Sequence, residues 1–303
     1  MERGYDTSRA NRQYIGATMK PTQILLATDL SCRCDRALDR ATALASEWQA
    51  RLIVLHALGE PEPVTDMPSW RRSLDPRQAA EQRVRDDLRG AEGLSVEVLV
   101  RQGKPAPLIL ETVGQRGCDL VVTGVARDET LGRMLLGTTV DAVVRSADVP
   151  VLVAKSRPRG PYRNVVVATD FSEGSRHALQ TVLAWLPEAS VSLFHAYAVA
   201  YEGLLGDQMA AREQVGRRRM EEARDFLADT PGVAGSGRVI PTVCEYGDVE
   251  VLLRDLVQAR AVDLVALGTA GRGRLASVLL GSVAQRLLSA IPVDVLAVRR
   301  PRD

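Results

Sequence analysis

Residues 164–172 read NVVVATDFS and residues 23–31 read QILLATDLS, so the same pattern occurs twice in one chain. Each stretch is an apolar run that ends in Ala-Thr-Asp, which is typical of a buried strand followed by a turn. Further residues match between the copies at a nearly constant spacing: His56 with His195, Gly103 with Gly247, Asp119 with Asp263 and Gly137 with Gly281. A spacing that drifts so little indicates an internal duplication.

Strand-like and helix-like patterns alternate within each copy. In the second copy, apolar runs occupy residues 164–169, 190–197, 239–246, 263–268 and 293–298, with helical patterns between them, as at 178–185 and 212–227. Near-continuous apolar runs indicate strands buried on both faces, and the alternation indicates a parallel sheet with right-handed crossovers. The sequence therefore predicts the α/β class, with two three-layer α/β/α domains, each built on a mostly parallel sheet of about five strands.

The boundary between the copies is marked by composition. Residues 155–162 read KSRPRGPY, which combines two prolines with a glycine, as linkers do. A chain of 303 residues also suits two domains better than one. We predict a disordered N-terminal arm at residues 1–19, a first domain at 20–156, a linker at 157–161 and a second domain at 162–303.

The charge balance excludes some classes of protein. Lys and Arg number 39 and Asp and Glu 38, for a net charge of +1, which lacks the basic footprint of a dedicated nucleic-acid binder. No apolar run approaches the ~20 residues of a membrane-spanning helix. The polar N-terminal stretch lacks the apolar segment of a secretory signal. We expect a cytoplasmic protein that neither binds nucleic acid nor inserts into a membrane.

Ligands of open α/β sheets bind beyond the carboxyl ends of the strands, where both copies carry Thr-Asp. Asp29 and Asp170 either stabilise the turn or face a ligand, and both interpretations stay open. Ser31 and Ser172, two residues further on, are predicted N-caps of the next helices.

A glycine-rich segment follows the fourth strand of the second copy. Gly268 and Gly271 are followed, after nine residues, by Gly281-Ser282 at the start of a predicted helix. Glycines let backbone amides approach an anion, and a helix N-terminus offers unpaired N–H groups, so the segment suits a phosphate. It has no Gly-Lys-Ser/Thr of a P-loop, and it does not follow the first strand as a dinucleotide fingerprint would. Ordinary turn glycines are the alternative.

These motifs in this order resemble the universal stress protein family, and their duplication resembles its tandem type. The resemblance covers residues 20–156 and 162–300. It implies Rossmann-like domains of the adenine nucleotide α-hydrolase kind, and the branch of the family with the glycine motif binds ATP. The site that it implies in the second copy comprises Thr169 and Asp170 by the ribose and adenine, the backbone of Ala196 at the adenine edge, and Gly268, Gly271, Gly281 and Ser282 around the phosphates. Arg272 and Arg274 add positive charge that the family motif does not require.

The first copy departs from this pattern in its glycine segment. Gly124, Gly137 and Thr138 are kept, but Arg127 stands where the second glycine belongs, and acidic residues follow it. A side chain at a position of close backbone approach obstructs phosphates, and nearby carboxylates repel them. Asp29 and Ala57 complete the weaker candidate site, which we expect to bind ATP poorly or not at all.

The leading functional prediction is an ATP-binding stress-response regulator, with Mg²⁺ held near Asp170 through the ATP phosphates rather than by protein ligands alone. It would act through protein partners and could form a homodimer. The alternatives are a scaffold with a vestigial pocket and a slow ATPase, although His56 and His195 suit structural hydrogen bonds better than catalysis. A redox sensor built on Cys32 and Cys34 is a further alternative, because a helix N-terminus can lower a thiol pKa.

Overall fold

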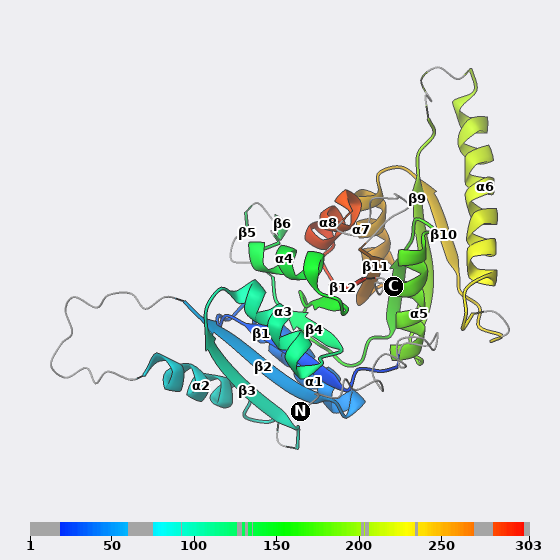
Figure 1. Cartoon of the computed structure of the whole chain (residues 1–303). Coiled ribbons are helices and arrows are strands. Elements are labelled where there is room, and N and C mark those ends of the chain that lie inside the picture. The colour runs from blue at the N-terminus through cyan, green and yellow to red at the C-terminus, as the bar shows by residue number, and fades with distance from the viewer. Residues whose placement is uncertain are drawn as a thin grey trace, which may run out of the picture. The chain divides into compact units, whose positions relative to one another are not determined.

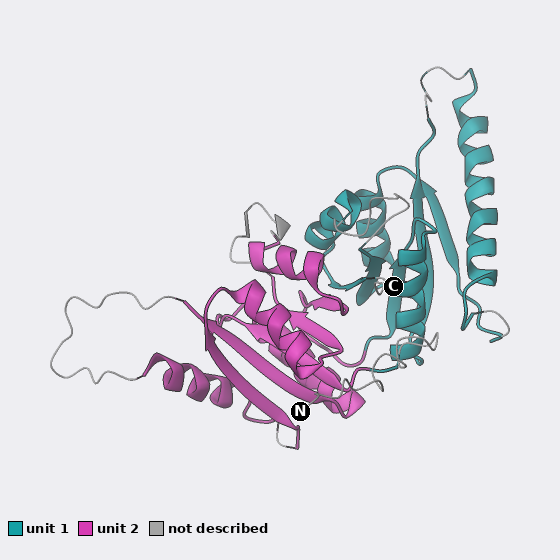
Figure 2. Cartoon of the chain, viewed as in Figure 1, with its two compact units in different colours: residues 1–20, 162–303 teal, residues 21–161 magenta. Residues whose placement is uncertain are grey.

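The chain forms two compact units. A computed structural model describes residues 19–59, 75–91, 93–125, 129–130, 133–134, 136–200, 203, 206–233, 236–269 and 281–299 (Figure 1). One unit, here called the N-terminal unit, comprises residues 21–161, and the other, the C-terminal unit, comprises residues 162–303 together with residues 1–20 (Figure 2). Each unit is described below by itself.

The N-terminal unit is built on five parallel strands in the order β3-β2-β1-β4-β7. Its strands are β1 (Gln23–Thr28), β2 (Arg51–Leu58), β3 (Val96–Gln102), β4 (Leu120–Thr123) and β7 (Val151–Val153). Its helices are α1 (Asp35–Trp48), α2 (Pro76–Asp87), α3 (Pro105–Arg116) and α4 (Thr138–Ser146). The short strands β5 (Glu129–Thr130) and β6 (Arg133–Met134) pair antiparallel in the connection before α4.

The C-terminal unit repeats this order as β10-β9-β8-β11-β12, again with parallel pairs. Its strands are β8 (Asn164–Ala168), β9 (Ser190–Tyr197), β10 (Thr242–Tyr246), β11 (Leu264–Gly268) and β12 (Asp294–Val298). Its helices are α5 (Glu173–Trp185), α6 (Gln208–Ala228), α7 (Val249–Ala259) and α8 (Ser282–Ala290). The predicted fold of two α/β domains with five-stranded parallel sheets is confirmed.

The central strands form the core of each unit, whereas the edge strands are more exposed. Residues 24–26 of β1 and 165–167 of β8 are buried, as near-continuous apolar runs predict. None of the five residues of β10 is buried, and β10 begins three residues later than predicted, after Pro241. Proline has no N–H to donate to a ladder, so it suits the position just before an edge strand. The prediction of burial on both faces is therefore wrong for this edge.

Two aspartates fix the amino ends of the first strands in the same way. The Asp119 carboxylate accepts hydrogen bonds from the backbone N–H groups of Thr22 and Gln23, at 2.8 and 3.0 Å. Asp263 accepts the backbone N–H groups of Arg163 and Asn164, at 2.9 and 3.2 Å. These bonds satisfy backbone N–H groups at the points where the chain enters the sheet of each unit, which explains why an aspartate recurs there in both copies.

The predicted linker and Met19, the last residue of the predicted arm, make contacts in the structure. In the N-terminal unit, the Arg36 and Arg40 guanidinium groups of α1 donate to the carbonyl oxygens of Lys155 and Gly160, at 2.8 and 3.1 Å. The predicted linker thus lies against α1. The predicted arm, residues 1–19, falls outside the described residues except for Met19, whose carbonyl accepts a bond from the Trp185 indole at 2.9 Å. Within the described ranges no helix is long and apolar enough to cross a membrane.

Candidate functional site

A cavity of about 330 Å³ opens at the carboxyl ends of β8, β9 and β11. Six of the residues predicted from the sequence line it together: Thr169, Asp170, Ala196, Gly268, Gly281 and Ser282. Gly271, Arg272 and Arg274 fall within residues 270–280, outside the described residues. The cavity also has walls that the sequence analysis did not single out, including Ser175, Val249 and Leu287. Its volume is in the range of small-molecule sites.

The turn after β8 directs Asp170 toward this cavity. Phe171 adopts a left-handed conformation with φ of 61°, and its backbone N–H donates to Thr169 Oγ1 at 2.8 Å. Asp170 Oδ1 accepts the backbone N–H of Ser172 at 3.1 Å. Ser172 in turn caps α5, because its Oγ accepts the N–H of Ser175 at 3.3 Å. Asp170 therefore stabilises the turn with one oxygen while it lines the cavity.

Gly268 is required by packing of the protein itself. A Cβ atom added at Gly268 would lie 2.5 Å from the carbonyl carbon of Gly174 and 2.8 Å from the backbone nitrogen of Ser175. The end of β11 thus passes directly against the first turn of α5. The Ser175 hydroxyl lies 2.8 Å from the Thr169 hydroxyl in a buried hydrogen bond, so β8, β11 and α5 meet at one point.

Gly281 differs from Gly268 because no packing with the described residues demands it. It is the N-cap of α8 with φ of −60°, a conformation that any residue adopts, and an added Cβ would meet only the Thr269 carbonyl oxygen at 3.9 Å. Within the described residues no side chain caps α8, and its first residues, Ser282–Ala284, line the cavity. The first turn of α8 carries no acidic residue, so the positive end of its dipole meets the cavity.

The neighbouring helix α7 begins in the opposite manner. Its N-cap Asp248 accepts the backbone N–H groups of Glu250 and Val251, at 2.9 and 3.2 Å. Arg286 of α8 donates to Asp248 at 2.9 Å, and that hydrogen bond is the main reason why the pKa of Asp248 lies below its ordinary value. The ion pair joins the first turn of α7 to α8 beside the cavity. The Asp248 carboxylate already accepts the first amides of α7, so an anion in the cavity is better accommodated at the start of α8.

His195 closes the cavity on the β9 side and ties two strands together. Its Nδ1 lies 2.8 Å from the Thr169 carbonyl oxygen. A carbonyl only accepts, so Nδ1 carries the proton of this bond. The imidazole packs against Phe171 with ring centroids 4.4 Å apart. His56 makes the same bond to Thr28 in the N-terminal unit, at 3.0 Å. The two histidines thus hold the strand ends in place.

The N-terminal unit has a different helix start at the corresponding strand end. The prediction that Ser31 caps the next helix is wrong, because α1 begins at Asp35 with Cys34 as its N-cap. Counted from the serine of each unit, α1 begins one turn later than α5. Among the described residues, the buried Ser31 hydroxyl has no hydrogen-bond partner. A helix favours acidic residues in its first turn. Glu173 supplies one for α5, whereas in the N-terminal unit Asp35 is the first acid after Ser31.

The other candidates of the N-terminal unit surround this altered start. Asp29 Oδ1 accepts the backbone N–H of Ser31 at 2.9 Å. Gly124 approaches α1 less closely than Gly268 approaches α5, since an added Cβ would lie 3.1 Å from the Arg33 carbonyl oxygen. Ala57 lies in β2, Gly137 is the N-cap of α4, and Thr138 is its first residue. Arg127 and Asp128 are outside the described residues.

Cys34 does not have the environment of a redox-active thiol. Its Sγ donates to Asp29 Oδ1 at 3.1 Å, and burial is the main reason why its pKa rises from 9.0 to about 11. The thiolate is the reactive form of cysteine, so this thiol stays protonated and unreactive near neutral pH. Cys32 is exposed, and the two side chains form no disulfide.

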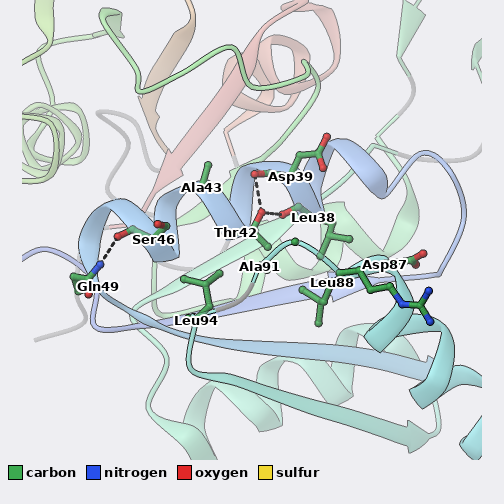
Figure 3. A pocket seen from close by; sticks show the side chains of 13 residues that line it. Leu38, Asp39, Thr42, Ala43, Ser46, Gln49, Asp87, Leu88, Ala91 and Leu94 are labelled. Atoms are coloured by element: carbon green, nitrogen blue, oxygen red, sulfur yellow. Dashed lines mark hydrogen bonds between the residues drawn. The ribbon is translucent and has the colours of Figure 1, made fainter.

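A larger cavity, of about 490 Å³, lies in the N-terminal unit between α1 and residues 87–94 (Figure 3). Its walls belong to segments that precede β2 and β3, at the amino ends of the strands. The side chains of Thr42 and Gln49 bond to carbonyl oxygens of their own helix, as the dashed lines show. Ligands of open α/β sheets bind at the carboxyl ends, so the cavity beside Asp170 is the better candidate despite its smaller volume.

A sequence model of the universal stress protein family matches residues 21–155 and again residues 161–299. The chain therefore belongs to this family and carries its domain twice. A universal stress protein of Thermus aquaticus is 35% identical over 136 residues, which are 44% of this chain and 97% of that protein. One from Mycolicibacterium smegmatis is 26% identical over 308 residues, covering 91% of this chain and 96% of the relative.

Solved structures match the fold along nearly the whole chain. A functionally unknown protein from Pseudomonas aeruginosa has a TM-score of 0.68 at 20% identity, with 96% of this chain and 95% of that chain covered. A universal stress protein from Archaeoglobus fulgidus has a TM-score of 0.61 at 19% identity, with 94% and 98% covered. At these identities the likeness shows the fold alone.

Proposed function

We propose that this chain is a stress-response regulator that binds one ATP in the cavity of the C-terminal unit. The observation that carries the proposal is the pairing, in one cavity, of an uncapped helix start at α8 with the Asp170 carboxylate. Phosphates would accept from the first amides of α8, and Asp170 would lie by the ribose and adenine. The backbone of Ala196 would meet the adenine edge.

Gly281 supports a close ligand at the start of α8. Among the described residues an added Cβ would meet only the Thr269 carbonyl oxygen, at 3.9 Å, and the backbone conformation suits any residue. A glycine that neither packing nor φ requires is explained by an approach that only a ligand makes. Gly268, in contrast, is explained by the contact with α5.

Mg²⁺ belongs to the proposal as a partner of the ATP phosphates rather than as an ion resident in the protein. Asp170 is the carboxylate on the cavity wall that could meet the hydrated ion, while Asp248 is engaged with the amides of α7 and with Arg286. Magnesium usually keeps several waters and binds through phosphates and one or two carboxylates. The regulator requires binding, and its function does not depend on hydrolysis.

The output of the bound state would be a conformation or surface that protein partners recognise, and two chains would associate as a homodimer. Location in the cytoplasm fits the proposal, because all four cysteines of the chain are free thiols in the structure. Free thiols are typical of a reducing compartment. The alternative is a scaffold whose cavity holds no nucleotide.

Calorimetric titration of the nucleotide-stripped full chain with ATP and Mg²⁺ tests the proposal. We expect about one ATP per chain, with binding lost in Gly271→Arg, which copies the first domain. Gly281→Ala should weaken binding at least ~10-fold with unchanged thermal stability, since its Cβ obstructs only the ligand. Gly137→Ala, at the corresponding helix start of the N-terminal unit, is the matched control and should bind as wild type does. If the wild-type chain takes up no nucleotide, the scaffold alternative stands.

A further inference from the structure

Two residues that correspond in the duplicated sequence, Cys34 and Ser175, act differently at the two strand ends. Counted from the Thr-Asp pair, each is the fifth residue after the aspartate. Ser175 lies inside the first turn of α5, where its N–H bonds to the Ser172 hydroxyl. Cys34 instead is the N-cap of α1, with φ of −81° and ψ of −9°, and its N–H donates to the Ser31 carbonyl oxygen at 2.9 Å. The same sequence position lies within the first turn of the helix in one unit and at the N-cap in the other.

The hydroxyl and the thiol choose different partners. Ser175 Oγ lies 2.8 Å from Thr169 Oγ1 and donates to the Ser172 carbonyl oxygen at 2.9 Å. It makes no bond to Asp170, whose hydrogen bond within the described residues comes from the Ser172 backbone. Cys34 Sγ donates to Asp29 Oδ1 at 3.1 Å, on the oxygen that also accepts the Ser31 amide. The aspartate of the N-terminal unit is therefore engaged by a side chain that its counterpart lacks.

The thiol also occupies space beside Gly124. A Cβ added at Gly124 would lie 3.5 Å from Cys34 Sγ, and Cys34 is only 9% exposed. In the C-terminal unit the corresponding glycine meets the backbone of Gly174 and Ser175 directly. The residue matching Gly174 is Arg33, and a Cβ added at Gly124 would lie 3.1 Å from its carbonyl oxygen and 3.5 Å from the Cys34 Cα. The strand end thus approaches the helix start less closely in the N-terminal unit, where the Cys34 sulfur lies beside it.

We propose that Cys34 is a specificity-determining residue that excludes nucleotides from the N-terminal unit. It does so by holding the Asp29 carboxylate and by placing its sulfur beside Gly124 at the end of β4. This inference rests on the proposed function of the C-terminal cavity. It adds a second barrier to the one that the sequence predicts at Arg127. Removal of the arginine alone leaves the carboxylate occupied, so both residues must change before the N-terminal unit binds ATP.

Four proteins test the proposal by the stoichiometry of ATP binding to the full chain: wild type, Arg127→Gly, Cys34→Ser and the double variant. We expect about one site in the first three and two in the double variant. Cys118→Ser combined with Arg127→Gly removes a buried thiol elsewhere in the unit and should keep one site. Two sites in Arg127→Gly, or one site in the double variant with intact near-ultraviolet dichroism, would overturn the role of Cys34. No site in wild type would instead refute the proposed function.

The reciprocal change tests the same idea where binding already occurs. Ser175→Cys should place a thiol within reach of Asp170 and weaken ATP binding at least ~10-fold. Ser175→Ala removes the hydroxyl but offers no donor to the carboxylate, so it should weaken binding less. Equal affinities of these two variants would show that the thiol does not compete for the aspartate, and the proposal would fail.

Discussion

Helices α1 and α5 each follow the first strand of their unit, a Thr-Asp turn and a serine. Counted from that serine, α1 nevertheless begins one helical turn later than α5. Both turns use a residue with positive φ, Leu30 at 58° and Phe171 at 61°. The divergence begins only with the three residues after the serine, Cys-Arg-Cys in one copy and Glu-Gly-Ser in the other. A duplicated scaffold can therefore keep its sheet while the residues just beyond a strand alter the crevice.

The amino ends of the strands behave in the opposite way. Asp119 and Asp263 accept the corresponding backbone amides in both units. At the carboxyl ends the histidine bonds are also shared, from His56 to Thr28 and from His195 to Thr169. These bonds satisfy backbone groups at the ends of the strands, so both copies need them whatever they bind. Differences between the units at the carboxyl ends are then informative about ligands, because the common bonds already account for the fold.

The largest expected effect comes from the two glycines at the ends of β4 and β11. Gly268→Ala should destabilise the C-terminal unit by about 3 kcal/mol, because its Cβ would lie 2.5 Å from the Gly174 backbone and neither segment can move freely. Gly124→Ala should cost the N-terminal unit about 1 kcal/mol, since its closest contact is 3.1 Å. Urea dependence of hydrogen exchange, followed by mass spectrometry, measures each unit separately. Equal losses would contradict the closer approach of β11 to α5.

The sequence predicted the repeated fold and missed the different starts of α1 and α5. Apolar runs and helical patterns predicted that strands and helices alternate along the chain. Six predicted site residues line one cavity because the carboxyl ends of parallel strands meet at one edge of the sheet. Ser31 was predicted to cap α1 on the strength of its residue type alone. The signal that could have corrected it is Glu173, an acid in the first turn of α5, against Cys32 and Arg33 in the other copy.

Ser175 was missed for a related reason. Its hydroxyl lies one turn into a helix, where serine is common and carries no motif. The partner that reveals its role, Thr169, is brought close by tertiary structure, as is Gly174 beside Gly268. The comparison of copies could have pointed to it, since Cys34 is the residue that replaces Ser175 at the matching position.

The second-largest expected effect is a dependence of the stability of the N-terminal unit on pH through Cys34. Burial raises the pKa of Cys34 from 9.0 to about 11, so the unfolded chain loses this proton first. The protonated Cys34 thiol therefore stabilises the folded N-terminal unit in full below pH 9, and this stabilisation is lost as the pH rises toward 11. We expect the N-terminal unit of wild type to lose about 2 kcal/mol more than that of Cys34→Ser over this range. Cys32→Ser, which removes an exposed thiol, should keep the wild-type loss.

Hydrogen exchange of α1 and β1 between pH 8 and pH 11, corrected for the intrinsic rate, measures this loss. The C-terminal unit has its own half-buried thiol, Cys244, whose pKa is also raised to about 11, chiefly by loss of solvent contact. Its loss should appear equally in wild type and in Cys34→Ser. A pH profile of the N-terminal unit that does not change on Cys34→Ser would show that the thiol is not held as its bond to Asp29 implies.

The smallest effect separates the two serines that follow the turns. Ser172→Ala should destabilise the C-terminal unit by about 1 kcal/mol, because its hydroxyl caps α5 through the N–H of Ser175. Ser31→Ala should leave the N-terminal unit unchanged or slightly more stable, since its buried hydroxyl has no partner among the described residues. In Cys34→Ser, however, α1 can start one turn earlier, and Ser31→Ala should then cost what Ser172→Ala costs. This coupling, measured as a double-mutant cycle by hydrogen exchange, asks whether Cys34 determines where the helix begins. Additive effects of the two substitutions would mean that Arg33 and the position of Asp35 set the start of α1 without the thiol.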